Sequence, residues 1–353
     1  MGLVDVYTAG HAGVHTYRIP ALAVTRQGTL LAFAEARHDG PGDAGDIDLV
    51  VRRSADAGRT WSTSTTVWDD GRNTCGNPAP VVDAETGRIV LPMTWNHGRD
   101  LERDIIAGRS REPRRAYVTA SDDDGVSWAQ ARELPELRQP QWGWYATGPG
   151  NAIQIGHGQY KGRIVAPANH SDRTGEGHFY RAHVICSDDA GESWFLGGVA
   201  GPATNESAVA ELGDGSLLLN MRSYAGRNRR ALSVSRDGGA TWSAPQLHEA
   251  LVEPVCQGSM IRSDAGPAGH LLFSNPDSET AREGLTVRAS ADDGATWQRT
   301  KVVYAGSAAY SSMAVLPDGR VGIVFERDRS TRISFAAFNL EELIASPLRR
   351  GPA

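Results

Sequence analysis

The segment Ser54-Ala55-Asp56-Ala57-Gly58-Arg59-Thr60-Trp61 carries the pattern that decides the fold, because the chain repeats it. The pattern is Ser-x-Asp-x-Gly-x-Thr/Ser-Trp, and it recurs at residues 121–128, 187–194, 235–242 and 290–297. In such a turn the Asp carboxylate can accept backbone N–H groups, the Gly takes a positive φ, and the Trp packs between neighbouring sheets. Five copies of one turn indicate a repeated scaffold rather than five ligand sites.

Strand patterns surround these turns in a constant order. Six segments consist of a tight turn and a buried strand, and they begin at Gly28, Gly87, Gly162, Gly215, Gly269 and Gly319. An alternating strand precedes each segment, and a further strand leads into each Asp-containing turn. Six four-stranded antiparallel units predict an all-β, six-bladed β-propeller, which protects strand edges by radial repetition. Two stacked β-sandwiches are the alternative, which the number and regularity of the units disfavour.

The sixth unit ends differently from the others, because residues 339–343 replace the Asp-containing turn. We therefore expect residues 4–7 to supply the missing outer strand and to join the two ends of the ring. No interdomain linker or low-complexity tract interrupts the pattern. The sequence thus predicts one catalytic propeller domain over residues 1–353.

Composition excludes several classes of protein. A net charge of -6 argues against nucleic acid or an anionic membrane as the main partner. Cys75, Cys186 and Cys256 form neither a disulfide framework nor a zinc pattern, and the histidines have no metal-ligand spacing. We therefore expect no metal and no cofactor. An anionic substrate would have to be bound by a local group of arginines.

The N-terminal residues and the hydropathy of the chain indicate where in or outside the cell the protein is expected. The chain has no apolar run of the length that a membrane span requires. Residues 1–6 lack a basic region and a long apolar region, so they do not form a signal peptide. The protein is expected in the cytoplasm if Met1 is the native start, and outside the cell if a leader was removed.

Antiparallel geometry brings candidate functional residues to one end of the propeller. Starts of first strands and loops after second strands share one end, and the Asp-containing turns share the other. The strand starts are Arg18, Asn77, the turn 148–150, Glu206, Gln257 and Tyr310. The second-strand ends and loops contribute Arg37, Asp43, Trp95, Asn96, Asn169, Arg222, Arg282 and Glu326. Arginines, carboxylates and one tyrosine thus converge, which is typical of a site for an acidic sugar.

The motif Tyr17-Arg18-Ile19-Pro20 together with the five Asp boxes resembles the sialidase (neuraminidase) superfamily. The resemblance covers essentially the whole chain and is to exo-α-sialidases of the glycoside hydrolase family 33 type. It implies a retaining enzyme that hydrolyses terminal α-linked sialic acid from glycoconjugates. The implied partner is a sialylated glycan or another acidic-sugar glycoside, and we expect a monomer.

The resemblance also implies which residues bind the substrate carboxylate. Arg18, Arg222 and Arg282 match the three arginines of the family, and Glu326 matches the carboxylate that orients the first of them. Arg288 is an alternative for the third arginine, although it lies within a predicted strand. A guanidinium suits this task because it binds a carboxylate through two hydrogen bonds and stays charged at any working pH.

The catalytic residues follow from the same resemblance. Tyr310 matches the nucleophile and Glu206 its base. A neutral tyrosine suits an anomeric carbon that already carries a carboxylate, and sialidases are exceptions to the rule of two catalytic carboxylates. Asp43 matches the acid/base, with Asp39 and Asp46 as alternatives.

The resemblance and the residues leave several points of substrate recognition open. Arg37 and Asn77 resemble neighbours of the sugar 4-hydroxyl, while Glu35 is interpreted as a surface or ion-pair residue. Trp142 and Trp144 line the pocket or pack beneath a loop. The substrate could instead be a related 2-keto-3-deoxy acid such as Kdn or Kdo. Two rival hypotheses are transfer of the sugar to another acceptor and a non-catalytic glycan-binding propeller.

Overall fold

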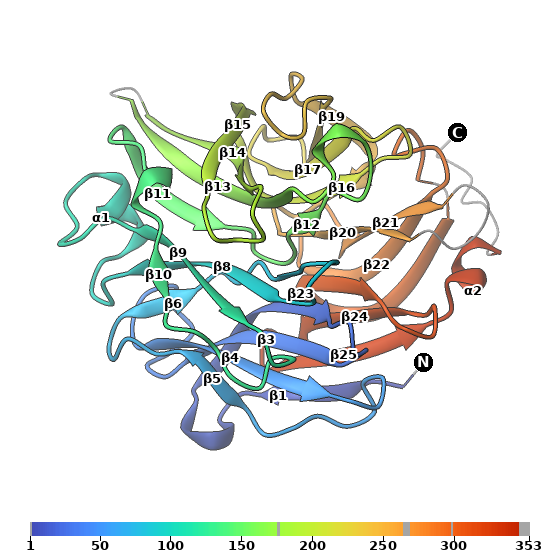
Figure 1. Cartoon of the computed structure of the whole chain (residues 1–353), viewed down its shortest axis with the longest axis horizontal. Coiled ribbons are helices and arrows are strands. Elements are labelled where there is room, and N and C mark those ends of the chain that lie inside the picture. Colours follow the sequence, from blue (N-terminus) through green and yellow to red (C-terminus); the bar gives the residue numbers. More distant parts are fainter. Residues whose placement is uncertain (1, 175–176, 264–268, 298, 346–353) are drawn as a thin grey trace.

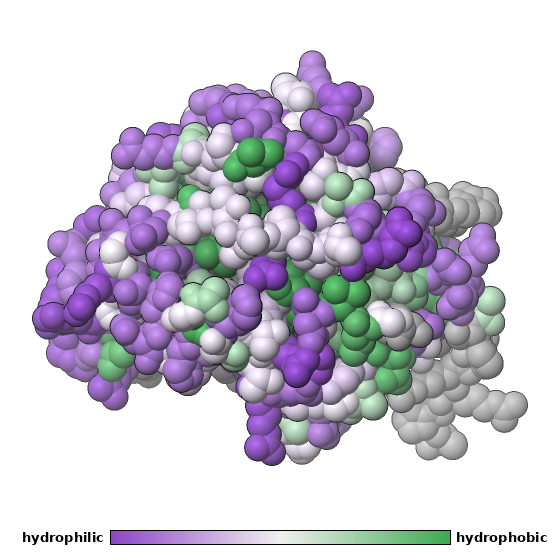
Figure 2. All heavy atoms as spheres, turned by 90° about the horizontal axis from the view of Figure 1, so that it is seen from below, coloured by the Kyte–Doolittle hydropathy of each residue, from purple (hydrophilic) through white to green (hydrophobic). Residues whose placement is uncertain are grey.

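The computed structural model describes residues 2–174, 177–263, 269–297 and 299–345 (Figure 1). Its regular structure is almost entirely β-strand, and the sheets are arranged around a common centre (Figure 1). The α-helices of these residues are α1 (Glu102–Ile106) and α2 (Leu340–Ile344), and at five residues each they are too short to cross a bilayer. The face seen from below is mostly hydrophilic, with smaller hydrophobic groups towards its middle (Figure 2).

The first half of the chain forms a nine-stranded sheet and a five-stranded sheet. The nine strands are β2 (Thr16–Val24), β3 (Leu30–Arg37), β4 (Ile47–Ser54), β5 (Thr65–Trp68), β6 (Thr74–Gly76), β7 (Val81–Val82), β8 (Ile89–Asn96), β9 (Arg115–Ser121) and β10 (Arg132–Glu133). The five strands are β11 (Trp142–Thr147), β12 (Ile153–Gln154), β13 (Ile164–Thr174), β14 (Gly177–Ser187) and β15 (Phe195–Pro202).

The second half forms a four-stranded sheet and a seven-stranded sheet. The four strands are β16 (Thr204–Glu211), β17 (Leu217–Ser223), β18 (Arg229–Ser235) and β19 (Gln246–Val252). The seven strands are β20 (Ser259–Ser263), β21 (His270–Pro276), β22 (Glu283–Ser290), β23 (Arg299–Val315), β24 (Val321–Arg327), β25 (Arg332–Phe338) and β1 (Val4–Thr8).

The predicted joining of the two ends of the chain is confirmed. β1 pairs antiparallel with β25, with Val4 opposite Phe335 and Thr8 opposite Arg332. Asp5 adds side-chain contacts, because its carboxylate accepts hydrogen bonds from Arg327, Arg332 and Ser334. The first strand of the chain therefore completes the sheet that contains the last one.

Two features of the strands were not expected. The first strand of the second unit, β7, has only two residues, and a break that contains Asn77 separates it from β6. Pro78 and Pro80 have no N–H to donate, so the ladder cannot continue through them. The first strand of the sixth unit is the end of the 17-residue β23, which pairs first with β22 and then with β24. That strand therefore joins two predicted units in one sheet.

The five Asp-containing turns adopt one hydrogen-bond pattern. In each turn the Ser hydroxyl donates to the Asp carboxylate, and the Gly N–H donates to the Ser oxygen. The Thr or Ser at the seventh position donates both its N–H and its hydroxyl to the same carboxylate. These bonds hold the pKa of Asp56 and of Asp123 at about 2. The aspartates are thus engaged by their own turns.

The tryptophans of these turns pack against side chains of other strands. Trp128 makes an edge-on contact with Phe33 of β3, and Trp61 makes one with Phe335 of β25, each with ring centroids 5.5 Å apart. Clusters of buried Val, Leu, Ile and Phe side chains fill the same spaces. The apolar core therefore lies between the sheets, and the strand ends near the centre remain available for a site.

Candidate active site

A pocket of about 200 Å³ lies where the starts of the inner strands meet the ends of the second strands. Most of the predicted site residues line it, namely Arg18, Arg37, Asp43, Asn77, Asn169, Glu206, Arg222, Arg282 and Tyr310. Glu326 is fully buried and forms an ion pair with Arg18 of the pocket, with 2.7 Å between Arg18 Nε and Glu326 Oε1. The structure thus brings together residues that are up to 308 positions apart in the chain.

Irregular strand pairing explains why these side chains reach the pocket. The register between β2 and β3 shifts between Arg18 and Ala21, and Ile19 adopts a φ of 57°. A bulge of this kind re-aims the neighbouring side chains, and a positive φ in a β-branched residue is strained. Glu326 supports the strained residue, because its Oε1 accepts the N–H of Ile19 at 2.9 Å.

The strands that carry Glu206 and Tyr310 are bulged at the equivalent place. The register between β16 and β17 shifts between Thr204 and Ser207, so Glu206 lies in the bulge opposite Arg222. The register between β23 and β24 shifts between Ala308 and Ser311, so Tyr310 lies opposite Glu326. The spacing of 16 residues that each pair shares in the sequence therefore reflects one repeated geometry.

Tyr310 and Glu206 form a hydrogen-bonded pair at the base of the pocket. The Tyr310 hydroxyl donates to Glu206 Oε1 at 2.5 Å, and Arg222 Nη1 donates to Glu206 Oε2 at 2.7 Å. Arg222 Nη1 also lies 3.3 Å from the Tyr310 oxygen. Burial, together with the negative charge of Glu206, raises the pKa of Tyr310 well above its usual value. The phenol is therefore neutral at neutral pH.

The three predicted arginines surround that phenol. The guanidinium carbons of Arg18 and Arg282 lie 5.4 Å and 5.6 Å from the centroid of the Tyr310 ring, and Arg222 contacts its hydroxyl. The Nε of Arg222 is buried without a hydrogen-bond partner among the described residues. Arg288 lies elsewhere, because its side chain is buried and pairs with Asn275 and Asp277. This cluster can bind an anionic group directly beside the tyrosine.

Asp43 reaches the pocket from the loop between β3 and β4. Its Oδ1 lies 2.8 Å from Arg37 Nη1, and its side chain is 68% exposed. Burial alone would raise the pKa of Asp43, but the charges of Arg37 and Arg18 outweigh that effect and lower it. This carboxyl is therefore ionised at neutral pH.

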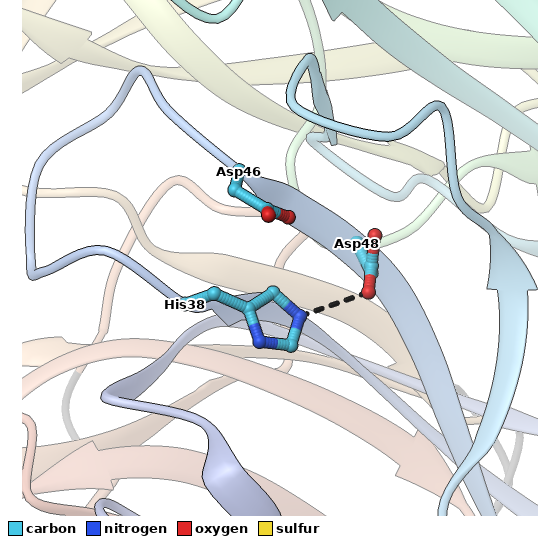
Figure 3. A group of neighbouring side chains, drawn as sticks. All are labelled: His38, Asp46 and Asp48. Atoms are coloured by element: carbon cyan, nitrogen blue, oxygen red, sulfur yellow. Dashed lines mark hydrogen bonds and ion pairs between the residues drawn. The ribbon is translucent and has the colours of Figure 1, made fainter.

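The other two candidate aspartates of this loop do not line the pocket. Asp46 lies with His38 and Asp48 (Figure 3), and one ligand atom from each of these residues lies within 4.8 Å of the others. His38 Nε2 is 2.9 Å from Asp48 Oδ2. Such a group could hold a divalent cation, which the histidine spacing in the sequence did not indicate. Asp39 accepts the N–H of Asp46 at 3.4 Å, so its carboxylate is engaged within the loop.

The structure decides between alternatives that the sequence left open. Glu35 is an ion-pair residue and is buried: its Oε2 pairs with Arg37 at 2.6 Å, and its Oε1 accepts the Asn77 N–H at 2.9 Å. Trp144 lines the pocket, whereas Trp142 packs in the core and stacks on His170 with ring centroids 3.7 Å apart. Trp142 and Trp144 are two positions apart, so a regular strand would direct both side chains to the same face. The register shift between Trp142 and Tyr145 separates them, and the sequence does not reveal this shift.

The repeated strand pattern of the sequence does not identify three further residues that line the pocket. Glu102 comes from α1, Arg114 follows the irregular loop after that helix, and Tyr224 follows β17. The Tyr180 hydroxyl donates to Glu102, and the Tyr180 and Tyr224 rings stack with centroids 5.3 Å apart. Insertions of this kind vary from unit to unit, so the repeat does not predict where their side chains lie.

Comparison with known proteins supports one family. A model of the family described as BNR repeat-like domain matches residues 28–323. The chain is 34% identical over 351 residues to a sialidase of Micromonospora viridifaciens, covering 95% of this chain but only 53% of that relative. It is 32% identical over 342 residues to an exo-alpha-sialidase of Aspergillus fumigatus, covering 90% of this chain and 80% of that relative. The solved Hadza microbial sialidase Hz136 matches its all-β sheets with a TM-score of 0.87 at 31% identity, covering 97% of this chain and 69% of that one.

Proposed function

We propose that this chain, which belongs to the sialidase family, is a retaining exo-α-sialidase that acts on sialylated glycans. One observation carries the proposal: the hydroxyl of Tyr310 donates to Glu206 at 2.5 Å within a ring of three arginines. A non-catalytic glycan-binding propeller has no need of a tyrosine held against a base. The proposed enzyme is a monomer with one propeller domain over residues 1–353.

Substrate binding depends on the arginines. A sialoside carries its carboxylate on the anomeric carbon C2, and Arg18, Arg222 and Arg282 offer N–H donors to that group. Glu326 engages Nε of Arg18 and so leaves the two terminal nitrogens of that guanidinium for the substrate. Because Tyr310 lies between these arginines, the same grip sets C2 beside the phenol oxygen.

The first chemical step forms a covalent sugar–tyrosine intermediate. The Tyr310 oxygen attacks C2, and its proton passes to Glu206, the hydrogen-bond partner that it already has. The bond from C2 to the aglycone oxygen breaks, and Asp43 gives its proton to that oxygen. A neutral phenol approaches this negatively substituted carbon with less repulsion than a carboxylate would.

The second step releases the sugar. Asp43, now ionised, takes a proton from water while the water oxygen attacks C2. The bond from C2 to Tyr310 breaks, and the phenolate recovers its proton from Glu206. Two successive displacements at C2 retain the anomeric configuration.

Asp43 must gain a proton before the first step, although neighbouring arginines lower its pKa in the empty pocket. Binding of the substrate explains why Asp43 gains a proton. Its carboxylate offsets the positive charge of Arg18, and its ring shields Asp43 from water. Both effects raise the pKa of Asp43, so proton uptake accompanies binding.

The strands support a six-bladed arrangement with five Asp boxes. Each of the six predicted units contains an antiparallel succession of strands, and β1 completes the last one. In this description β23 provides the outer strand of the fifth blade and the inner strand of the sixth. The inner strands of all six blades then face the central axis, and the pocket lies at one end of it.

Trapping the intermediate tests the proposed reaction. A 3-fluorinated sialosyl fluoride should form an adduct that accumulates, because the fluorine slows the second step more than the first. Mass spectrometry of the digested protein should find the added sugar on the peptide that contains Tyr310. Proton NMR should detect the α-anomer as the first product of a natural sialoside. An adduct on another residue, or an initial β-anomer, would refute the mechanism.

A further inference from the structure

Asn169 is a buried asparagine on the pocket wall whose amide group has no partner. It belongs to β13, it is 1% exposed, and neither its Oδ1 nor its Nδ2 has a hydrogen-bond partner among the described residues. Leaving a buried polar group unpaired is unfavourable, because the group loses its hydrogen bonds to water and gains none in the protein. Three asparagines from other second strands differ, because Asn96, Asn220 and Asn275 each accept a hydrogen bond from a buried arginine. Asn169 thus keeps a donor and an acceptor for a ligand.

Arg114 lies on the same wall, and its hydrogen-bond acceptors in the described structure are neutral oxygens. Its Nε donates to the Tyr145 carbonyl at 2.6 Å, its Nη2 to Asn77 Oδ1 at 2.6 Å, and its Nη1 to Asn96. Its guanidinium carbon lies 4.0 Å from the centroid of the Trp144 ring. These three bonds use three of the five N–H groups of an arginine. The remaining two N–H groups can donate to an oxygen atom of a ligand.

The position of this wall relative to the sugar follows from the proposed function. The family resemblance puts Asn77 beside the 4-hydroxyl, and Arg114 is bonded directly to Asn77. Asn169 is the strand partner of Ala146 on β11, the strand that also carries Trp144. Because C3 of the sugar carries only hydrogen atoms, the substituent next to the 4-hydroxyl is the one at C5, and this group of side chains faces it.

The wall has little apolar surface for an acyl group. Its lining residues are Asn77, Glu102, Arg114, Trp144, Ala146 and Asn169. Among these, Ala146 is the single aliphatic side chain, and Arg114 packs against the Trp144 ring. The N–H and C=O of an acetamido group could pair with Asn169. The methyl group of the same acetamido group would, however, lie against polar atoms of the pocket and displace the water that hydrogen-bonds to them. A hydroxyl group can both accept from Arg114 and pair with Asn169.

We infer that this subsite, named here the C5 subsite and formed by Arg114, Trp144 and Asn169, takes a hydroxyl group in preference to an N-acyl group. The preferred substrate is then an α-ketoside of the deaminated nine-carbon acid Kdn rather than of N-acetylneuraminic acid. The inference rests on the proposed function and narrows its substrate class. Arg114 and Asn169 act in it as specificity-determining residues.

Paired substrates test the inference directly. The 4-methylumbelliferyl α-ketosides of Kdn and of N-acetylneuraminic acid differ at C5 alone, so the ratio of their kcat/KM values reports on the C5 subsite. We expect this ratio to favour Kdn at least about ten-fold, the discrimination that one unpaired buried group supplies. An equal rate or a preference for the N-acetyl substrate would overturn the inference.

Binding of non-hydrolysable analogues separates failure of the inference from failure of the proposed function. Calorimetry with the 2,3-dehydro-2-deoxy forms of both acids measures the C5 subsite without catalysis. If neither ketoside is cleaved but the Kdn analogue binds at least ten-fold more tightly, the hydrolase proposal fails and the inferred subsite stands. If the N-acetyl analogue binds as tightly or more tightly, or if neither analogue binds, the inference is overturned.

Variants of Asn169 identify the group responsible. Asn169→Leu keeps the size of the side chain and removes its polar atoms, so the preference for Kdn should fall at least ten-fold. The melting temperature should not decrease, because Asn169 makes no hydrogen bond to lose in the described structure. Asn169→Ser is the matched variant that still offers a donor and an acceptor, through its hydroxyl group, and it should keep more of the preference. A ratio that is the same in all three proteins would overturn the role of Asn169.

Discussion

The inner strands carry opposite chemistry at their two ends. At one end, β2 and β16 contribute Arg18 and Glu206 to the polar pocket of about 200 Å³, and β23 contributes Tyr310 from the beginning of its segment that pairs with β24. At the other end, the same strands line a cavity of about 620 Å³ whose residues are mainly apolar. Those apolar residues include Leu22, Val24, Val81, Val82, Ala210, Leu212, Met260, Ile261 and Met313. One set of strands thus builds a polar end and an apolar end.

Regular pairing separates the two ends. From Ala21 to Val24 the register of β2 against β3 is unbroken, and the same is true of β23 against β24 from Ser311 to Val315. The bulges occur only before these segments, at the polar end. A conformation such as that of Ile19 costs about 1–3 kcal/mol, and the surrounding contacts must outweigh it. The two ends belong to the same strands, so the difference between them comes from the bulges at the polar end and not from the use of different strands.

Removal of the Tyr310 hydroxyl should produce the largest effect at the polar end. We expect Tyr310→Phe to lower kcat/KM for a fluorogenic sialoside at least about 1000-fold, since the proposed nucleophile is lost. The melting temperature should change little, because the ring remains. Tyr304→Phe is the matched control: it alters a tyrosine on the same strand whose hydroxyl bonds Asp328 outside the pocket. Retention of a tenth of the activity by Tyr310→Phe would contradict the assignment.

Loss of one arginine from the same end should have a smaller effect. We expect Arg222→Ala to lower kcat/KM about 100-fold, because a charged donor to the substrate and to Glu206 disappears. Arg222→Lys keeps the charge without the two-pronged geometry and should lie between that variant and the wild type. The exposed Arg236 provides a control, since its removal leaves the pocket intact. Unchanged kinetics in Arg222→Ala would refute its proposed role.

A change at the apolar end should affect stability instead of activity. Met313 is fully buried, so Met313→Ala should lower the free energy of unfolding by about 3 kcal/mol through the cavity that it leaves. Urea denaturation measures this loss, and kcat/KM at low temperature should stay within about three-fold of the wild type. A large kinetic defect with normal stability would show that the two ends are not independent.

A buried histidine pair beneath the polar end should make the fold sensitive to acid. His170 Nδ1 and His183 Nδ1 lie 3.0 Å apart, and burial lowers the pKa of His170 to about 4 although Asp172 opposes this shift. The unfolded chain therefore binds more protons than the folded chain between pH 6.5 and pH 4, so stability is lost as the pH falls through that range. We expect a loss of about 2 kcal/mol from pH 6.5 to pH 4.5 for His170 alone.

Urea denaturation at a series of pH values measures this dependence. His170→Phe can keep an aromatic contact with Trp142 and cannot titrate, so the slope between pH 6.5 and pH 4.5 should flatten. His157→Phe is the control, because His157 is 82% exposed. An unchanged slope in His170→Phe would mean that other groups cause the acid sensitivity.

Much of the fold and of the site was predictable from local patterns. The Asp-containing turns are recognisable because Ser, Asp, Gly and Thr bond within eight residues of one another. The equal spacing of Glu206 to Arg222 and of Tyr310 to Glu326 follows from one strand, one turn and the next strand. Repetition thus placed the principal site residues at one end before any contact between them was known.

What the sequence alone determined is therefore the set of repeated elements and the residue types at their ends, since these depend on neighbours a few positions apart. The tertiary structure decided which loop aspartate reaches the pocket, which tryptophan lines it, and that Arg114 and an unpaired Asn169 meet beside Asn77. The physical reason is that side-chain direction depends on bulges and on partners from distant strands. A positive φ at Ile19 or a missing partner for Asn169 has no signature in the local pattern.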